Sequence, residues 1–204
     1  MSHDISSEDA KELLENNVKY KLYAAQQHLN NLKILRQNHE STRSFQGRLP
    51  WEVEIECFLF HIMGVRDSLL IRLNEKLILG IDTDKVKLKL YKEVNKALKT
   101  IGKGSLLQDL KNSSKAATSN TPPGWLWVLN DLRIQSTHRN LLNIRVDQEI
   151  KENITTGTSS SSEPQVYFKS DPQKNLEIIP FLEAGLKDMK KLVEDIENKE
   201  PLLK

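Results

Sequence analysis

The chain has 204 residues, and its 30 lysines and arginines nearly balance its 28 aspartates and glutamates. A chain of this length without a linker-like segment predicts one domain over residues 1–204, and its near-neutral charge neither requires nor excludes a nucleic-acid partner. The single cysteine, Cys57, excludes an internal disulfide, and neither a signal-peptide pattern nor a run of ~20 apolar residues is present, so we expect a cytoplasmic protein without a membrane partner.

Two long helices are predicted in the first half of the chain. Apolar residues recur every three or four positions from Ser6 to about residue 38 without glycine or proline, which predicts one continuous helix. A loop over 39–49 follows, after which Pro50 begins a second helix and Gly80 ends it. Because the second helix is apolar on most sides, we expect it at the centre of the fold.

A narrow polar stripe interrupts the apolar surface of this second helix. Its members recur every three or four residues: Glu54, Cys57, His61, Gly64, Ser68, Arg72 and Glu75. The simpler interpretation is a solvent-facing edge, in which the glycine permits close contact with a neighbouring helix. The alternative is that His61 and its neighbours face a polar cleft.

A third helix is predicted from Asp82, which offers a capping side chain, to Gly102. Its outer surface is rich in lysine: Lys85, Lys87, Lys89, Lys92, Lys96 and Lys99. Such a row is ordinarily a solvated face, but it also attracts a phosphate backbone. Residues 105–111 can add a short helical turn before a polar loop.

The helix that begins at Trp125, directly after Pro122-Pro123-Gly124, is the most distinctive segment. Its first turns are among the most apolar in the chain. It then changes abruptly to polar residues: Arg133, Gln135, Ser136, Thr137, His138, Arg139 and Asn140. A helix that begins as core and ends in hydrogen-bonding groups is a natural place for buried chemistry, and it is our first candidate for the functional site.

After Asn143 the apolar period changes to two, which predicts strands at 144–150 and 165–169. The loop over 153–163 between them is too rich in serine and threonine to pack, and we expect it to be disordered. Together these segments form a small β-hairpin insertion, residues 144–170.

A last helix with near-heptad apolar spacing runs from Ile179 to Ile196 and ends in a charged tail with Pro201. The predicted fold class is therefore all-α. We expect a five-helix up-and-down bundle with the β-hairpin inserted before the last helix.

Several reaction classes lack their sequence patterns. The chain has no glycine-rich phosphate loop, no strand–helix alternation and no serine nucleophile elbow. Its five histidines are scattered, so neither a metal nor another cofactor is expected. Cys57 and His61 are one helical turn apart and could supply half a metal site, but a buried cysteine that packs beside a core histidine is the simpler interpretation.

Arg133 and His138 are the remaining candidates for chemistry. An arginine holds a phosphate through a planar fork of donors, and a histidine moves a proton near neutral pH. Such a pair can cut RNA without a metal. The base takes the proton of a 2′-hydroxyl, that oxygen attacks the adjacent phosphorus, and the cation offsets the growing charge.

The geometry of a regular helix constrains this interpretation. Positions five residues apart diverge by ~140°, so Arg133 and His138 converge only in a groove shared with another helix or a second subunit, or where the helix is distorted. The alternative is a structural role. In that case Arg133 pairs with Asp131 or Glu54, and His138 forms a hydrogen bond near the helix end.

The run from Leu132 to Asn140 places Arg-x4-His late in the penultimate core helix of an all-helical bundle. This arrangement resembles the HEPN (higher eukaryotes and prokaryotes nucleotide-binding) superfamily, and the resemblance covers residues 7–142 and the final helix. It implies a homodimer in which two copies of the motif meet in a cleft. Many members are metal-independent endoribonucleases of toxin–antitoxin, abortive-infection and other prokaryotic defence systems, in which an antitoxin is a protein partner. Arg133 and His138 would be the catalytic pair.

One position departs from the superfamily pattern. Active members usually have a polar residue, often asparagine, directly after the arginine, whereas this chain has Ile134. Gln135 or Asn130 could substitute for it in space. Inactive members of the superfamily serve as RNA-binding or dimerising modules.

These observations support three functional hypotheses. The first is a HEPN-like RNA-binding protein that cleaves RNA, with Arg133 anchoring the phosphate and His138 acting as general base or acid. Other polar residues would support the pair or bind the RNA backbone: Asn130, Gln135, Ser136, Thr137, Arg139, Asn140 and His61 for the first role, and Lys85, Lys89, Lys92, Lys96 and Lys99 for the second.

The second hypothesis is a catalytically inactive HEPN-like dimerisation or interaction module, which Ile134 favours. The third is a helical bundle that binds a small ligand between Trp125, Trp127 and the polar stripe of the second helix.

Overall fold

The computed structural model of the chain describes residues 5–38, 45–84, 89–138, 144–147, 150–153, 158–161, 165–168 and 177–203. These ranges are predominantly helical, which confirms the all-α prediction. The helices are α1 (Ser7–Glu15), α2 (Asn17–Gln37), α3 (Phe45–Lys76), α4 (Leu90–Thr100), α5 (Gln108–Ser113), α6 (Trp125–His138) and α7 (Ile178–Lys199), followed by a 3-10 turn at Pro201–Leu203.

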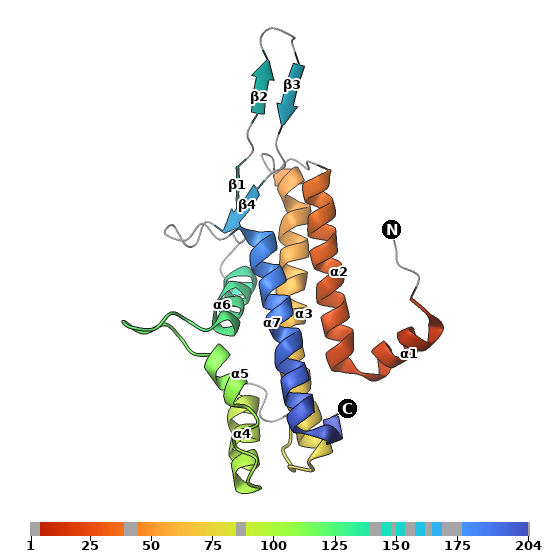
Figure 1. Cartoon of the computed structure of the whole chain (residues 1–204), viewed down its shortest axis with the longest axis vertical. Helices are drawn as coiled ribbons and strands as arrows, with labels where there is room; N and C mark the ends of the chain where they lie inside the picture. Colours follow the sequence, from red (N-terminus) through yellow and green to blue (C-terminus); the bar gives the residue numbers. More distant parts are fainter. Residues whose placement is uncertain are drawn as a thin grey trace.

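Three long helices, α2, α3 and α7, lie side by side and form the centre of the molecule (Figure 1). Helices α4 and α6 both contact α3, at different levels along its length (Figure 1). Helix α1 contacts α2 and projects away from the rest, and it contains no buried residue. The arrangement leaves α3 surrounded by other helices, as its apolar sequence predicted.

The core is continuous across these helices. Its largest fully buried side chains come mainly from α3, and they include Trp51, Phe58 and Met63. Helix α2 contributes Leu29 and Leu32, and α4, α6 and α7 add further leucines and isoleucines. Burial of this apolar surface is the main favourable contribution to folding.

The structure contradicts the prediction of one continuous N-terminal helix, because the chain breaks at Asn16. Asn16 has φ −121° and ψ 94°, outside the helical region. Its side-chain oxygen accepts hydrogen bonds from the backbone N–H groups of Val18 (3.1 Å) and Lys19 (3.2 Å). Asparagine competes with the helical backbone in this way, so it caps α2 instead of continuing α1.

The predicted start of the second helix at Pro50 is also wrong, because α3 begins at Phe45 and contains Pro50. A proline inside a helix removes one backbone hydrogen bond and costs ~3 kcal/mol. Two features offset this cost. Trp51 is completely buried, and the guanidinium of Arg48 donates to the Glu52 carboxylate from Nε (2.9 Å) and from Nη2 (2.6 Å), across the proline.

The end of α3 is closed by Asn74. Its side-chain amide donates to the carbonyl of Ile81 (2.9 Å) and accepts from the N–H of the same residue (3.0 Å). Between them, Gly80 has φ 69°, the left-handed conformation that glycine adopts without strain. The predicted third helix is shorter than expected, because α4 begins at Leu90, and residues 85–88 lie outside the described ranges.

Four short strands lie between α6 and α7: β1 (Ile144–Asp147), β2 (Ile150–Asn153), β3 (Thr158–Ser161) and β4 (Gln165–Phe168). β1 pairs antiparallel with β4, and β2 pairs antiparallel with β3. The prediction placed a disordered loop over 153–163, which contains β3. Because β3 has no apolar residue, its sequence carries no strand pattern. It pairs with β2 through backbone hydrogen bonds.

Two further features differ from the sequence prediction. The described ranges contain seven α-helices where five were predicted, because Asn16 separates α1 from α2 and because α5 is a helix of its own. Part of the charged C-terminal tail packs against the fold, although Pro201 and Leu202 are exposed. Leu203 is completely buried, and the buried Glu200 pairs with Lys103.

Candidate functional site

Helix α6 carries the candidate motif, and close packing fixes both its start and its core face. A side chain at Gly124 would place its Cβ 2.1 Å from the carbonyl oxygen of Ser113, so only glycine permits the approach of α5 to α6. Further along, Leu129 packs 3.0 Å from the Cβ that a side chain at Gly185 of α7 would have. The motif therefore lies on a helix whose position against α5 and α7 is tightly defined.

The two motif positions lie on different sides of α6. Arg133, one turn beyond the buried Leu129, is half-buried. Position 138 is the last residue of the helix, and it diverges from Arg133 by ~140°. It falls instead on the same side as Ile134, one turn before it, which is 37% exposed. Because the helix is continuous through both positions, its backbone places them on different sides of α6.

Several predicted site residues fall outside what the structure describes. The backbone of Thr137 and His138 belongs to α6, but their side chains are outside the described part of the chain. Arg139 and Asn140 lie outside it entirely. The pairing of Arg133 with His138 therefore stays a prediction.

The other polar residues of α6 are placed as follows. The side-chain amide of Gln135 donates to Asp131 (2.7 Å), and the Ser136 hydroxyl donates to the backbone carbonyl of Arg133 (2.9 Å). Asn130 is half-buried and precedes Arg133 by three positions, which makes the two residues neighbours on the helix surface. Of the two predicted substitutes for the missing asparagine, Asn130 is therefore the one beside Arg133.

The lysine row on α4, which we define as Lys89, Lys92, Lys96 and Lys99, is exposed along its length. At ~100° per residue these four positions fall within an arc of ~80°, opposite the buried Leu90, Val94 and Leu98. Within the described ranges, none of the four lysines forms an ion pair. Lys85, the fifth predicted member, lies outside those ranges.

The polar stripe of α3 lies against α2, in what we call the α2–α3 seam. His28 Nδ1 is 2.7 Å from one oxygen of the Glu54 carboxylate, and Asn31 donates to the other (3.2 Å). The rings of His28 and His61 are stacked, with centroids 5.3 Å apart and planes inclined by 13°. Glu54 is thus bound to side chains of α2. The sequence analysis had named Glu54 as one of two ion-pair partners of Arg133, in the interpretation that gives Arg133 a structural role.

His61, which we predicted to support the catalytic pair, lies in this seam. Its ring contacts Tyr20 and His28 of α2 and the neighbouring Phe60. Burial, together with the nearby His28 and Lys21, lowers the pKa of His61. Burial and two glutamates, Glu54 and Glu56, raise the pKa of the Cys57 thiol.

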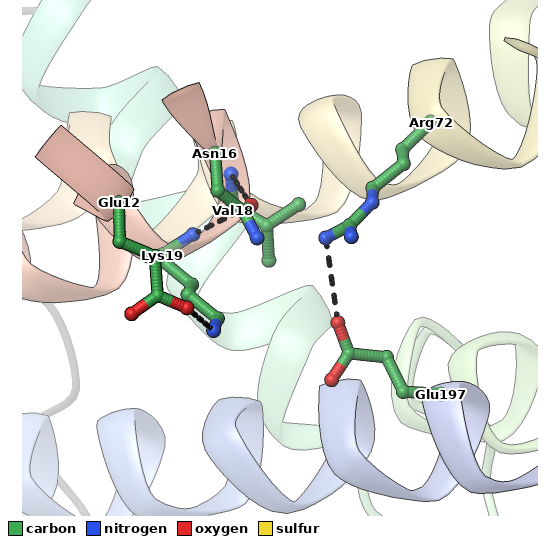
Figure 2. A network of polar contacts seen from close by, with 6 residues as sticks. All are labelled: Glu12, Asn16, Val18, Lys19, Arg72 and Glu197. Atoms are coloured by element: carbon green, nitrogen blue, oxygen red, sulfur yellow. Dashed lines mark hydrogen bonds and ion pairs between the residues drawn. The ribbon is translucent and has the colours of Figure 1, made fainter. Parts of the chain in front are cut away.

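A cavity of about 250 Å³ lies where the stripe reaches the junction of α1 and α2. Ser68, Arg72 and Glu75 line it from α3, and Asn16 and Val18 line it from the start of α2. Figure 2 shows Arg72 reaching toward Glu197 of α7, to which it donates at 3.5 Å, beside the Asn16 cap. Trp125 and Trp127, which we predicted to border a ligand site, do not contribute to this cavity.

Comparison of the chain with protein-family models, curated proteins and solved structures gives no match. The functional assignment therefore rests on the residues themselves. Within the described ranges no helix is long and apolar enough to span a bilayer, and no three metal-ligating side chains converge.

Sequence reasoning missed the α2 side of the seam. Tyr20, Lys21 and His28 lie on α2, and none of them was predicted to contact the polar stripe of α3. Their only sequence signal is spacing along one face of α2, and a single sequence does not tell which helix that face meets.

Proposed function

We propose that this chain is a HEPN-like RNA-binding protein that forms a homodimer and acts as a metal-independent endoribonuclease. The exposed, unpaired lysine row on α4 is the observation that supports RNA binding, because it presents a line of positive charge to a phosphate backbone. The resemblance of the α6 motif to HEPN ribonucleases supports cleavage.

The proposed homodimer is what the HEPN resemblance implies, and the helix geometry agrees with it. Since α6 is regular through the motif, Arg133 and His138 of one copy diverge by ~140°. Two copies that meet at the ends of their α6 helices would place Arg133 of one beside His138 of the other. This arrangement would make cleavage depend on dimerisation.

In the proposed reaction His138 takes the proton of a 2′-hydroxyl, and the freed oxygen attacks the adjacent phosphorus. The 5′-oxygen of the next nucleotide leaves and takes up a proton, so the products carry a 2′,3′-cyclic phosphate and a 5′-hydroxyl. Arg133 holds the phosphate and offsets its growing negative charge. Asn130, next to Arg133, would orient the phosphate in place of the asparagine that Ile134 replaces.

The test is incubation of wild type and two variants with synthetic single-stranded RNA in EDTA. We expect wild type and the matched control His28→Gln, which loses a histidine outside α6, to release 2′,3′-cyclic phosphate ends. We expect His138→Ala to lose cleavage by 10²-fold or more while remaining a dimer. Equal cleavage by wild type and His138→Ala would refute the assignment of the base.

A second candidate is a catalytically inactive HEPN-like module that binds RNA or only dimerises, and Ile134 favours it. In the same experiment this candidate predicts RNA binding or dimerisation by wild type without cleavage. Under the first candidate, the biological setting would be the cytoplasm of a prokaryote, as part of a defence or toxin–antitoxin system with an antitoxin partner.

A further inference from the structure

We propose that the α2–α3 seam is a pH-sensitive latch, in which a proton on His61 weakens the packing of α2 on α3. The proposal is independent of the RNA-binding function. It rests on the unequal surroundings of two stacked histidines.

His28 has an acidic partner. Its Nδ1 lies 2.7 Å from Glu54, whose other oxygen is held by Asn31, so a proton on His28 is balanced by a carboxylate. The resulting ion pair joins α2 to α3.

His61 has no such partner. Its Nδ1 is buried without a hydrogen bond, and within the described ranges no carboxylate pairs with it. The side chains around it are Phe60 on α3, with Tyr20, Lys21 and His28 on α2. The charged group among them is the Lys21 ammonium, which also lies 5.6 Å from the centre of the Phe60 ring.

A proton on His61 would therefore add a positive charge that no carboxylate balances. The imidazolium would lie stacked on the His28 ring, with centroids 5.3 Å apart, and near the Lys21 ammonium. Lys21 lies over the same part of α3, because its side chain packs against Gly64, where an added Cβ would be 2.8 Å from it. Repulsion acts between α2 and α3, the two helices that share the most contact in the fold.

The direction of the pKa shift agrees with this geometry. Burial, His28 and Lys21 all lower the pKa of His61 below its ordinary value of about 6.5. When α2 separates from α3, His61 regains that ordinary pKa and binds a proton more readily. The separated state is thus increasingly favoured as pH falls below about 6.5, and the effect levels off below the pKa of the folded state.

The test measures amide hydrogen exchange of α2 at pH 7.5, 6.5 and 5.5, corrected for the intrinsic rate, with α7 as the internal reference. In wild type we expect protection of α2 to fall between pH 6.5 and 5.5. Over this one pH unit the fall should be about threefold if the pKa of His61 is lowered by one unit, and it should approach about fivefold for larger shifts. Protection of α7 should change less.

Two variants remove the proton-binding group: His61→Phe keeps an aromatic ring, and His61→Gln keeps a polar side chain. We expect either variant to abolish the loss of α2 protection on acidification, whatever its stability at pH 7.5. Tyr20→Phe is the matched control, because it keeps the ring contact with His61 and should retain the wild-type pH dependence.

The NMR titration of the His61 ring, assigned by its disappearance in His61→Phe, gives an independent readout. We expect its midpoint below 6.5. The latch is refuted if wild type and both His61 variants lose α2 protection equally, if wild type loses none, or if His61 titrates at or above its ordinary pKa.

Discussion

The α2–α3 seam and the lysine row of α4 carry polar residues at the same helical spacing, yet their surroundings are opposite. In the seam, Glu54 and His61 face side chains of another helix at hydrogen-bonding or ring-contact distance. On α4, the lysine row faces solvent without a partner in the described ranges. The spacing of polar residues thus identifies one face of a helix. Whether that face contributes to stability or to binding depends on whether another helix packs against it.

The largest stability difference between the two regions is expected at Glu54. Glu54→Ala removes the acceptor of both His28 and Asn31, which should lower the free energy of unfolding by ~1–3 kcal/mol in a urea titration. Glu75→Ala, at the exposed end of the same stripe, is the control and should change it by less than ~0.5 kcal/mol. Equal effects would mean that the seam contributes no more to stability than a solvated edge.

Removal of the lysine row should change RNA binding and leave the free energy of unfolding nearly unchanged. The triple variant Lys92→Gln, Lys96→Gln, Lys99→Gln should unfold within ~0.5 kcal/mol of wild type, because these side chains are exposed. Its binding to single-stranded RNA should weaken, and the slope of log K against log salt should become shallower by ~2, since each lost phosphate contact removes ~0.7.

The matched control for that experiment removes three lysines from α7: Lys187, Lys190 and Lys191. They are exposed, and Lys190 donates to Gln26 at 3.1 Å. If the α7 variant loses as much RNA affinity as the α4 variant, the binding reflects net charge alone, and α4 is not a specific contact surface.

A smaller effect distinguishes two side chains of α6. Asn130→Ala should slow RNA cleavage by less than His138→Ala does, because Asn130 only orients the phosphate. Gln135→Ala should have a weaker effect still, since the Gln135 amide is bound to Asp131. A stronger effect at Gln135 in single-turnover cleavage would show that the amide leaves Asp131 to act at the site.

The mildest prediction concerns Cys57, whose thiol has a raised pKa because of burial and the nearby Glu54 and Glu56. The thiolate is the reactive form, so Cys57 should react slowly with a thiol reagent at pH 7 and faster only at alkaline pH. The same chain unfolded in guanidinium is the reference. Equal rates in the folded and unfolded chain would show that the seam does not shield the thiol.

The features that were predictable from the sequence are those set by periodicity. The apolar pattern around Phe58 correctly indicated a central helix, and Pro122-Pro123-Gly124 correctly marked the start of α6 at Trp125. These signals are local, because they depend only on residues within a few turns of one another.

What the sequence did not reveal depends on competition or on distant contacts. Asn16 breaks a helix that its neighbours would continue, because its side chain offers the backbone another partner. Pro50 is tolerated inside α3, where Trp51 is buried and Arg48 reaches across to Glu52. Leu203 is buried by tertiary packing that no local pattern encodes.

The candidate site divides in the same way. The sequence pointed to α6 and, through the three-residue spacing, to Asn130 beside Arg133, but it could not show that the Gln135 amide is bound to Asp131. Nor could it place His61, because the identity of the helix facing a polar stripe is a property of the fold.

The separate cap at Asn16 gives the experimenter a convenient boundary. Helix α1 buries no side chain, and α2 satisfies its own first N–H groups through Asn16. A shortened chain that begins at Asn16 should therefore keep its melting temperature within a few degrees. Leu14, which is 77% exposed, is correspondingly a position where a fluorescent label can be attached without disturbing the core.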